Sequence, residues 1–269
     1  MFTIAYKNLY TIFGTAALLA TSAISARAGS LYVSTSNGSV GSVDEATGVY
    51  THLLSSRGFT DIALDTAGDL WGITSSNLYS IDLNASSANL VGSFGGGSLN
   101  GLGFSSDGAL YGTGGSGFYS VDTNTGVASK IASLSGFRSS GDIVYDETRD
   151  LFWATSSGDS LWTITKDGVS NRVGNIGYRS VYGLAFGDDN TLFGYTSRGQ
   201  QLALNLDNGS GMFVKSITGM SSPGYSYLWG SASNPSDGSP TIPTQSTPEP
   251  SAVFGLATLG VIMLRRRSH

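Results

Sequence analysis

The sequence predicts an all-β fold: a five-bladed β-propeller of four-stranded blades, with the first blade closed by a C-terminal strand. Two observations lead to this prediction. A four-element pattern repeats about every 41 residues between Ser30 and Asn234, and a fixed period of this length is typical of propellers. In addition, 38 of the 269 residues are glycine, which forms tight turns between short strands without steric strain.

The most regular element of the repeat is a leucine followed by an aromatic residue. Its five copies are spaced by 39, 40, 41 and 41 residues: Leu31-Tyr32, Leu70-Trp71, Leu110-Tyr111, Leu151-Phe152 and Leu192-Phe193. Turns that contain aspartate precede the copies at Leu70 and Leu110. We expect the aromatic rings to pack between neighbouring blades. This pattern resembles the blades of sensor-type and other bacterial propellers, and the resemblance implies the fold alone.

Three further apolar elements complete each unit. Apolar and polar residues alternate, as in half-buried strands, at 40–44, 78–82, 118–122 and 161–165, with a weaker copy at 202–205. A closing segment follows at 49–54, 89–94, 128–134, 171–176 and 212–217. A fourth element precedes the leucine-aromatic pair at 62–64, 102–104, 143–145 and 184–186. The first unit lacks this element, and residues 225–229 supply it if Leu228 is equivalent to Leu184. A β-sandwich or a β-solenoid is the alternative, because both also use short, regularly spaced strands.

The first 28 residues have the pattern of a signal peptide. Lys7 precedes an apolar stretch from Leu9 to Ala20, and the small residues Ala26 and Ala28 place the predicted cleavage before Gly29. The alternative is an N-terminal membrane anchor. The apolar stretch is shorter than the roughly 20 residues that a spanning helix needs, so we predict a cleaved signal and an exported protein.

Beyond the predicted body at 29–234, the chain divides into a linker at 235–247 and a terminal segment at 248–269. The linker is rich in proline, serine and threonine, a composition typical of extended, unpacked chain. The terminal segment contains Pro248-Glu249-Pro250, an apolar run from Ser251 to Leu264, and the cluster Arg265, Arg266 and Arg267. A helical run of this length spans about 21 Å and engages a membrane only where the bilayer thins. The arginines are expected on the cytoplasmic side.

These three terminal features, in this order, resemble the PEP-CTERM sorting signal of exported Gram-negative proteins. The resemblance implies that an exosortase recognises Pro248, Glu249 and Pro250 and removes the tail, so that contact with the inner membrane is transient. It also implies that the mature protein reaches the cell surface or the extracellular polysaccharide matrix. Signal peptidase and exosortase are then the processing partners. An ordinary C-terminal anchor is the alternative and gives the same topology without processing.

The composition excludes several classes of function. In a mature body that ends at Pro250, nine basic residues face 19 acidic residues, which argues against nucleic acid as a partner because phosphate binding needs clustered Lys and Arg. The chain has no cysteine, so lipoprotein attachment and thiolate chemistry are excluded. His52 is the one histidine before the tail, too few for a Ser-His-Asp triad or a histidine-rich zinc site. We expect His52 to be a structural residue of an outer strand.

Carboxylates are the remaining catalytic groups. Asp146, Glu147 and Asp150 form one acidic turn, and Asp188 and Asp189 form another. Two acids roughly 5–10 Å apart can hydrolyse a glycosidic bond, so a secreted glycan hydrolase or lyase is the alternative function. Both clusters, however, occupy the same turn of successive repeats, where aspartate binds nearby backbone groups. We therefore predict no catalytic residue and no enzyme activity.

Two oxygen-rich turns raise the question of a structural calcium ion. They span Asp122–Gly126 and Asp207–Gly211. A calcium ion needs six to eight oxygen ligands, and neither turn completes the EF-hand spacing with its distal glutamate. We predict no metal site and no cofactor, with structural calcium as the alternative.

Arginine lies beside an aromatic residue at three equivalent junctions between blades, and these six residues are the candidate ligand contacts. They are Arg57, Phe59, Phe137, Arg138, Tyr178 and Arg179. An aromatic face can stack on a sugar, and arginine can bind a carboxylate through two parallel hydrogen bonds. In the alternative interpretation, the rings pack between blades and the arginines cover them. We predict a non-catalytic module that binds envelope polysaccharide or protein, or has a purely structural role.

Overall fold

The computed structural model describes residues 31–220 and 227–233. The predicted signal peptide, linker and sorting segment lie outside the described residues. The described secondary structure consists of five four-stranded antiparallel sheets. Within these residues no helix is long and apolar enough to cross a membrane.

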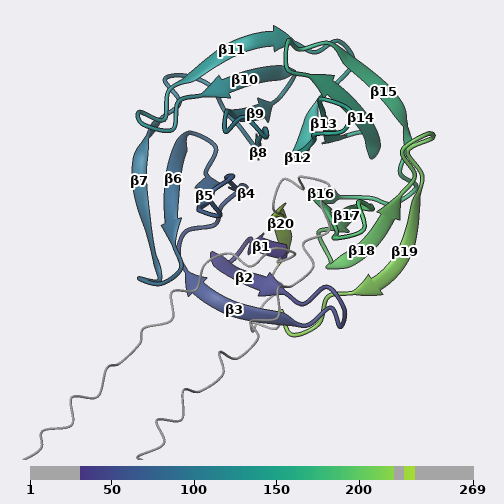
Figure 1. Cartoon of the computed structure of the whole chain (residues 1–269), viewed down its shortest axis with the longest axis horizontal. Helices are drawn as coiled ribbons and strands as arrows, with labels where there is room; N and C mark the ends of the chain where they lie inside the picture. Colours follow the sequence, from purple (N-terminus) through teal and green to yellow (C-terminus); the bar gives the residue numbers. More distant parts are fainter. Residues whose placement is uncertain (1–30, 221–226, 234–269) are drawn as a thin grey trace, which may run out of the picture. The chain divides into compact units, whose positions relative to one another are not determined.

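The five sheets form blades around a common centre, with consecutive strands running from the innermost to the outermost position (Figure 1). The first blade contains β20 (Leu228–Ala232), β1 (Leu31–Thr35), β2 (Ser39–Val43) and β3 (Tyr50–Ser55). The second contains β4 (Asp61–Leu64), β5 (Leu70–Ile73), β6 (Asn77–Asp82) and β7 (Ser87–Ser93). The third contains β8 (Gly101–Phe104), β9 (Leu110–Gly114), β10 (Gly117–Val121) and β11 (Ala128–Ser133). The fourth contains β12 (Ser139–Asp146), β13 (Leu151–Ser156), β14 (Ser160–Thr165) and β15 (Ser170–Asn175), and the fifth contains β16 (Val181–Phe186), β17 (Leu192–Thr196), β18 (Gln200–Leu204) and β19 (Gly211–Ser216).

The innermost strands contact one another in the order β20, β4, β8, β12 and β16, and β16 contacts β20 again. The contacts therefore close a ring. The predicted fold class is confirmed, including the four strands of each blade and the closure of the first blade by a C-terminal strand.

The register of that closing strand corrects one sequence prediction. Ser231 pairs with Val33, the residue that follows Leu31-Tyr32, and Leu184 pairs with Gly194, the residue that follows Leu192-Phe193. Ser231 is thus the equivalent of Leu184, and the predicted equivalence of Leu228 is wrong by three residues. The connection between β19 and β20 is longer than the other blade junctions, which displaces the closing strand along the sequence.

Apolar side chains from adjacent blades form the core. Tyr111 of the third blade and Phe152 of the fourth have ring centroids 5.0 Å apart, and Trp71 of the second blade lies 6.1 Å from Phe104 of the third. Tyr32 is 3% exposed, and Phe193 packs half-buried against the core between the fifth and first blades. The predicted packing of the recurring aromatic residues between blades is confirmed.

The strand directions give the ring two distinct ends. The turns that join the first and second strands of each blade, such as 65–69 and 147–150, lie at one end, which we call the inner-turn end. The connections from one blade to the next, such as 56–60 and 134–138, lie at the other, which we call the junction end. Tyr32 pairs with Ala232, so the described chain begins and ends at the inner-turn end.

Candidate functional site

The junction end carries exposed arginines at equivalent positions. Arg57, Arg138 and Arg179 each follow the outermost strand of one blade and precede the innermost strand of the next, and all three side chains are exposed. Arg198, in the turn between β17 and β18, is also exposed at this end. Sequence reasoning missed Arg198 because that turn lies outside the repeated aromatic-arginine pattern. In the described loops of this end, Asp159 is the one acidic residue.

The three repeated arginines differ in what they contact. The Arg57 guanidinium donates a hydrogen bond of 3.0 Å to the Tyr79 hydroxyl and lies 4.6 Å from the centroid of that ring. Among the described residues, the guanidinium groups of Arg138 and Arg179 have no hydrogen-bond or ion-pair partner. Two of the three arginines can therefore bind a ligand without first breaking a contact within the described chain.

The aromatic residues beside these arginines do not share their exposure. Phe59 is 0% exposed and Phe137 is 1% exposed. Their rings lie against Tyr79 and Trp162, with centroid distances of 5.6 Å in both pairs. Tyr178 is half-buried against the core between the fourth and fifth blades. The two phenylalanine rings fill space between blades, so they offer no face on which a sugar can stack.

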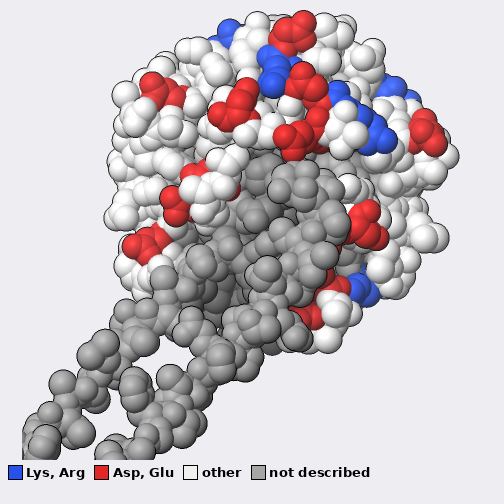
Figure 2. Space-filling model, viewed as in Figure 1, with Lys and Arg blue, Asp and Glu red and all other residues white. Residues whose placement is uncertain are grey.

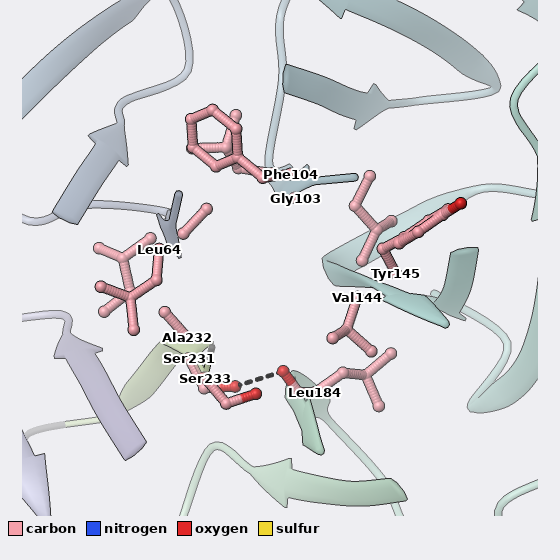
Figure 3. Close-up of a pocket in the computed structure, with 13 residues that line it drawn as sticks. Leu64, Gly103, Phe104, Val144, Tyr145, Leu184, Ser231, Ala232 and Ser233 are labelled. Carbon is pink, nitrogen blue, oxygen red and sulfur yellow. Dashed lines mark hydrogen bonds between the residues drawn. The ribbon is translucent and has the colours of Figure 1, made fainter. Parts of the chain in front are cut away.

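The centre of the ring is narrow. Side chains from all five innermost strands converge there, including Leu64, Phe104, Val144, Leu184 and Ser231 (Figure 3). They enclose a cavity of about 20 Å³, which is room for about one water molecule and far below the volume of a typical ligand pocket. The carbonyl oxygen of Leu184, on the neighbouring strand β16, lies 3.0 Å from the Ser231 hydroxyl and is one of two acceptors within reach of that hydroxyl's single proton. A sugar would therefore bind at an end of the ring rather than inside it.

Two buried acids, Asp61 and Asp142, lie at the centre of the ring, on the side of the junction end. We call them the hub acid pair. Asp61 is 0% exposed and Asp142 is 1% exposed. Asp61 accepts hydrogen bonds from the backbone N–H groups of Ile62 (2.9 Å) and Leu102 (2.7 Å). Asp142 Oδ2 accepts bonds from the N–H of Leu184 (2.7 Å) and from the N–H (3.2 Å) and hydroxyl (2.9 Å) of Ser231. Burial raises the pKa of both carboxyls well above the usual range for aspartate.

Glycine occupies the equivalent position in the other three blades, at Gly101, Gly183 and Gly230. A Cβ atom on Gly230 would lie 2.3 Å from Asp61 Oδ1, so a side chain there would displace the acid. Sequence reasoning missed the pair. The available signal was an acid directly before the buried strand residues 62–64 and 143–145, where other repeats have glycine.

The acidic turns proposed for hydrolysis are occupied by local bonds. Asp146 is 5% exposed and accepts bonds from Arg149 (2.8 Å) and from the Trp153 indole N–H (3.0 Å). Hydrogen bonds from Tyr145 and Lys166 lower the pKa of Asp150, and a backbone N–H from Thr191 lowers the pKa of Asp189. Glu147 and Asp188 are exposed in the same two turns. A general acid for glycoside hydrolysis needs a raised pKa, whereas the pKa values of Asp150 and Asp189 are lowered. The local hydrogen bonds in these turns are those expected of structural aspartates.

The two oxygen-rich turns and His52 are bound in the same local way. Asp122 Oδ1 accepts the N–H groups of Asn124 (2.7 Å) and Thr125 (3.1 Å), while Asn205 Oδ1 accepts those of Asp207 and Asn208. Across residues 31–220 and 227–233, no three His, Asp or Glu side chains are grouped so that they could hold a metal ion. His52 lies exposed on β3 between the hydroxyls of Ser39 and Ser55.

Comparison with known proteins supports the architecture. No protein-family model matches the chain, and no curated protein matches it in sequence. A crystal structure of a nidogen/laminin complex aligns over 76% of this chain and 97% of that chain, with a TM-score of 0.54 and 12% identity. A structural genomics protein of unknown function from Bacteroides thetaiotaomicron aligns over 74% of this chain and 61% of that chain, with a TM-score of 0.50 and 13% identity.

This chain is a five-bladed β-propeller. At identities this low the likeness concerns the fold alone, and the same fold hosts many functions. A propeller is compatible with a binding or structural module. Any ligand of this propeller would be recognised by its own side chains.

Proposed function

We propose that this protein is an exported module of the cell surface or extracellular matrix, whose propeller binds an anionic polysaccharide through the junction end. The observation that carries the proposal is the set of four exposed arginines there, with Asp159 as the one acid in the described loops of that end. The Asp159 carboxylate accepts the backbone N–H of Ser180 at 2.9 Å. Arginine suits carboxylate groups because its planar fork donates two parallel hydrogen bonds.

Charge favours one orientation of such a complex. The protein as a whole is acidic, with 19 Asp and Glu against 14 Lys and Arg, and Figure 2 shows acidic side chains spread around one face of the body with fewer basic ones among them. A polyanion would be repelled by most of this surface and attracted by the arginine-bearing junction end. This asymmetry supports the junction end as the binding surface.

The path of the chain supports the same orientation. The described body begins at Leu31 and ends at Ser233, and pairing of β1 with β20 places both at the inner-turn end. The sorting segment that we expect at 248–269 follows from that end. Until an exosortase removes that segment, the chain leaves the described body at the end opposite to the exposed arginines.

Co-elution with a polysaccharide tests the proposal. The purified protein is mixed with a uronic acid polymer, or with neutral dextran of the same length, and followed by size-exclusion chromatography with light scattering. We expect co-elution with the uronic acid polymer alone, and its loss in the Arg138→Gln/Arg179→Gln variant. The matched control is Lys130→Gln/Arg172→Gln, which removes two exposed charges from the outer strands β11 and β15.

Equal retention by the two double variants would overturn the assignment of the junction end. The same chromatograms report polymer length. Shortening of the polymer would overturn the non-catalytic part of the proposal and direct attention to the acids of the inner-turn end.

A further inference from the structure

The hub acid pair connects all five blades. Each innermost strand has a single strand neighbour, so backbone groups on its open edge need other partners. Asp61 of the second blade accepts N–H groups from its own strand and from β8 of the third blade. Asp142 of the fourth blade accepts N–H groups from β16 of the fifth blade and from β20 of the first. Strand β20 also brings the two carboxyl groups close to each other, because Ser231 donates to Asp142 while a Cβ atom on the preceding residue, Gly230, would lie 2.3 Å from Asp61 Oδ1.

One oxygen of this network lacks a donor. Asp142 Oδ1 is buried and receives no N–H or O–H from the described residues, whereas Asp142 Oδ2 accepts three bonds and each Asp61 oxygen accepts one. Two neighbouring carboxylates inside a protein cannot both be ionised at low cost. A proton held between Asp142 Oδ1 and Asp61 satisfies the remaining oxygen and removes the repulsion.

We propose that Asp61 and Asp142 share one buried proton and that this proton closes the ring of blades, so that the propeller opens more readily once it is lost. The groups that face the pair from β8, β16 and β20 are the N–H of Leu102, the N–H of Leu184, and the N–H and hydroxyl of Ser231. None of these titrates in the accessible range. The charged group that faces each carboxyl is therefore the other carboxyl.

The direction of the pH effect follows from burial. Burial raises the pKa of both acids, and the charge of Asp142 raises that of Asp61 further. The folded protein then keeps a proton that the unfolded chain releases near pH 4. Stability from the pair is complete below that pH and falls as the pH rises through the raised pKa. Over that range, one retained proton increases the unfolding equilibrium constant up to tenfold per pH unit.

Two amide variants separate the proton from the rest of the network. In Asp142→Asn, the side-chain amide donates to Asp61 where the proton lay, and the amide oxygen still accepts the three bonds from Leu184 and Ser231. In Asp61→Asn, an amide nitrogen replaces an oxygen that accepted a backbone N–H, so Ile62 or Leu102 loses its partner. Asp142→Asn therefore keeps every hydrogen bond of the network and Asp61→Asn loses one, whichever carboxyl carries the proton.

Urea unfolding of the purified protein between pH 5 and 8 is the test. We expect Asp142→Asn to match the wild type at pH 5 within about threefold in the unfolding constant, and to be at least tenfold more stable than it at pH 8. We expect Asp61→Asn to unfold at least tenfold more readily than the wild type at pH 5. Parallel pH profiles for Asp142→Asn and the wild type, or equal effects of the two substitutions, would overturn the proposal.

Infrared spectroscopy tests the proton without any change at the pair. Glu45→Gln protein serves here, because the Glu45 carboxyl also has a raised pKa. We expect one protonated-carboxyl band in the folded protein at pH 7 that disappears on unfolding. Absence of that band would overturn the proposal even if neither Asn variant folds.

Discussion

The two ends of this propeller use charged side chains in different ways. At the inner-turn end, aspartates such as Asp65 and Asp146 bind the turn backbone and an indole N–H of the following strand. At the junction end, Arg138 and Arg179 bind no described residue. A charge that already has local partners stabilises the fold, whereas an unpartnered exposed charge adds little to stability and is available to a ligand. The comparison therefore separates the end whose charges stabilise the fold from the end that we propose to bind a ligand.

The largest expected effect is at Asp146. Changing Asp146 to Ala leaves the indole N–H of the buried Trp153 and the backbone N–H of Arg149 without their acceptor. We expect a loss of about 2–4 kcal/mol in unfolding free energy, because a buried donor without a partner is costly. Urea unfolding monitored by tryptophan fluorescence measures it.

Glu147→Ala is the matched control, since Glu147 is exposed in the same turn, and it is expected to change stability by less than about 0.5 kcal/mol. If both substitutions had the same small effect, the inner-turn acids would not be structural and the comparison would fail.

A smaller effect is expected at Asp65, the equivalent residue of the second blade. Asp65 is half-buried, and it accepts the N–H groups of Ala67 and Asp69 and the indole N–H of Trp71. Because water can replace part of these bonds, we expect Asp65→Ala to cost about 1 kcal/mol. The same urea measurement applies, and a cost larger than that of Asp146→Ala would contradict the importance given to burial.

The smallest expected effect concerns Glu45, where the first blade meets the inner turn of the fifth. Burial, together with the charges of Asp188 and Asp189, raises the pKa of Glu45 to about 7, although the neighbouring Lys215 acts to lower it. The folded state therefore keeps a proton that the unfolded chain loses near pH 4.5, so this contribution to stability declines as the pH rises from there to about 7.

We expect the Asp188→Asn/Asp189→Asn variant to lower the titration midpoint of the Glu45 carboxyl, as followed by NMR. The wild-type protein gives the reference midpoint. A midpoint that does not move would mean that the two turn acids exert no field on Glu45.

Much of this architecture could be predicted from the sequence because every blade buries the same positions. The leucine-aromatic pairs and their steps gave the number of blades, and the missing element before Leu31 indicated closure from the other end. The register of the closing strand β20 was not predictable, since Gly and Pro residues in the preceding connection change its length without leaving a periodic signal. Counting residues alone placed Leu228 where the register places Ser231.

The hub acid pair was not predictable for a different reason. Asp61 and Asp142 bind N–H groups in later repeats, 41 and 42 residues along the chain, and Asp142 also binds Ser231. No local pattern encodes contacts that form only when the ring closes. The burial of Phe59 and Phe137 has the same origin: the sequence places an aromatic beside an arginine, and packing between blades decides which of the two reaches the surface.

We propose that the junction end binds an anionic polysaccharide and that the inner-turn end does not. The most direct measurement is the affinity of a fluorescent uronate oligosaccharide for three proteins at 50 and 200 mM salt: wild type, Arg138→Gln/Arg179→Gln, and Asp188→Asn/Asp189→Asn. We predict that the arginine variant binds at least tenfold more weakly at 50 mM salt with unchanged stability. The wild-type affinity should fall as salt rises, and the aspartate variant should bind no more weakly than the wild type. Equal affinity of the wild type and the arginine variant would contradict the account.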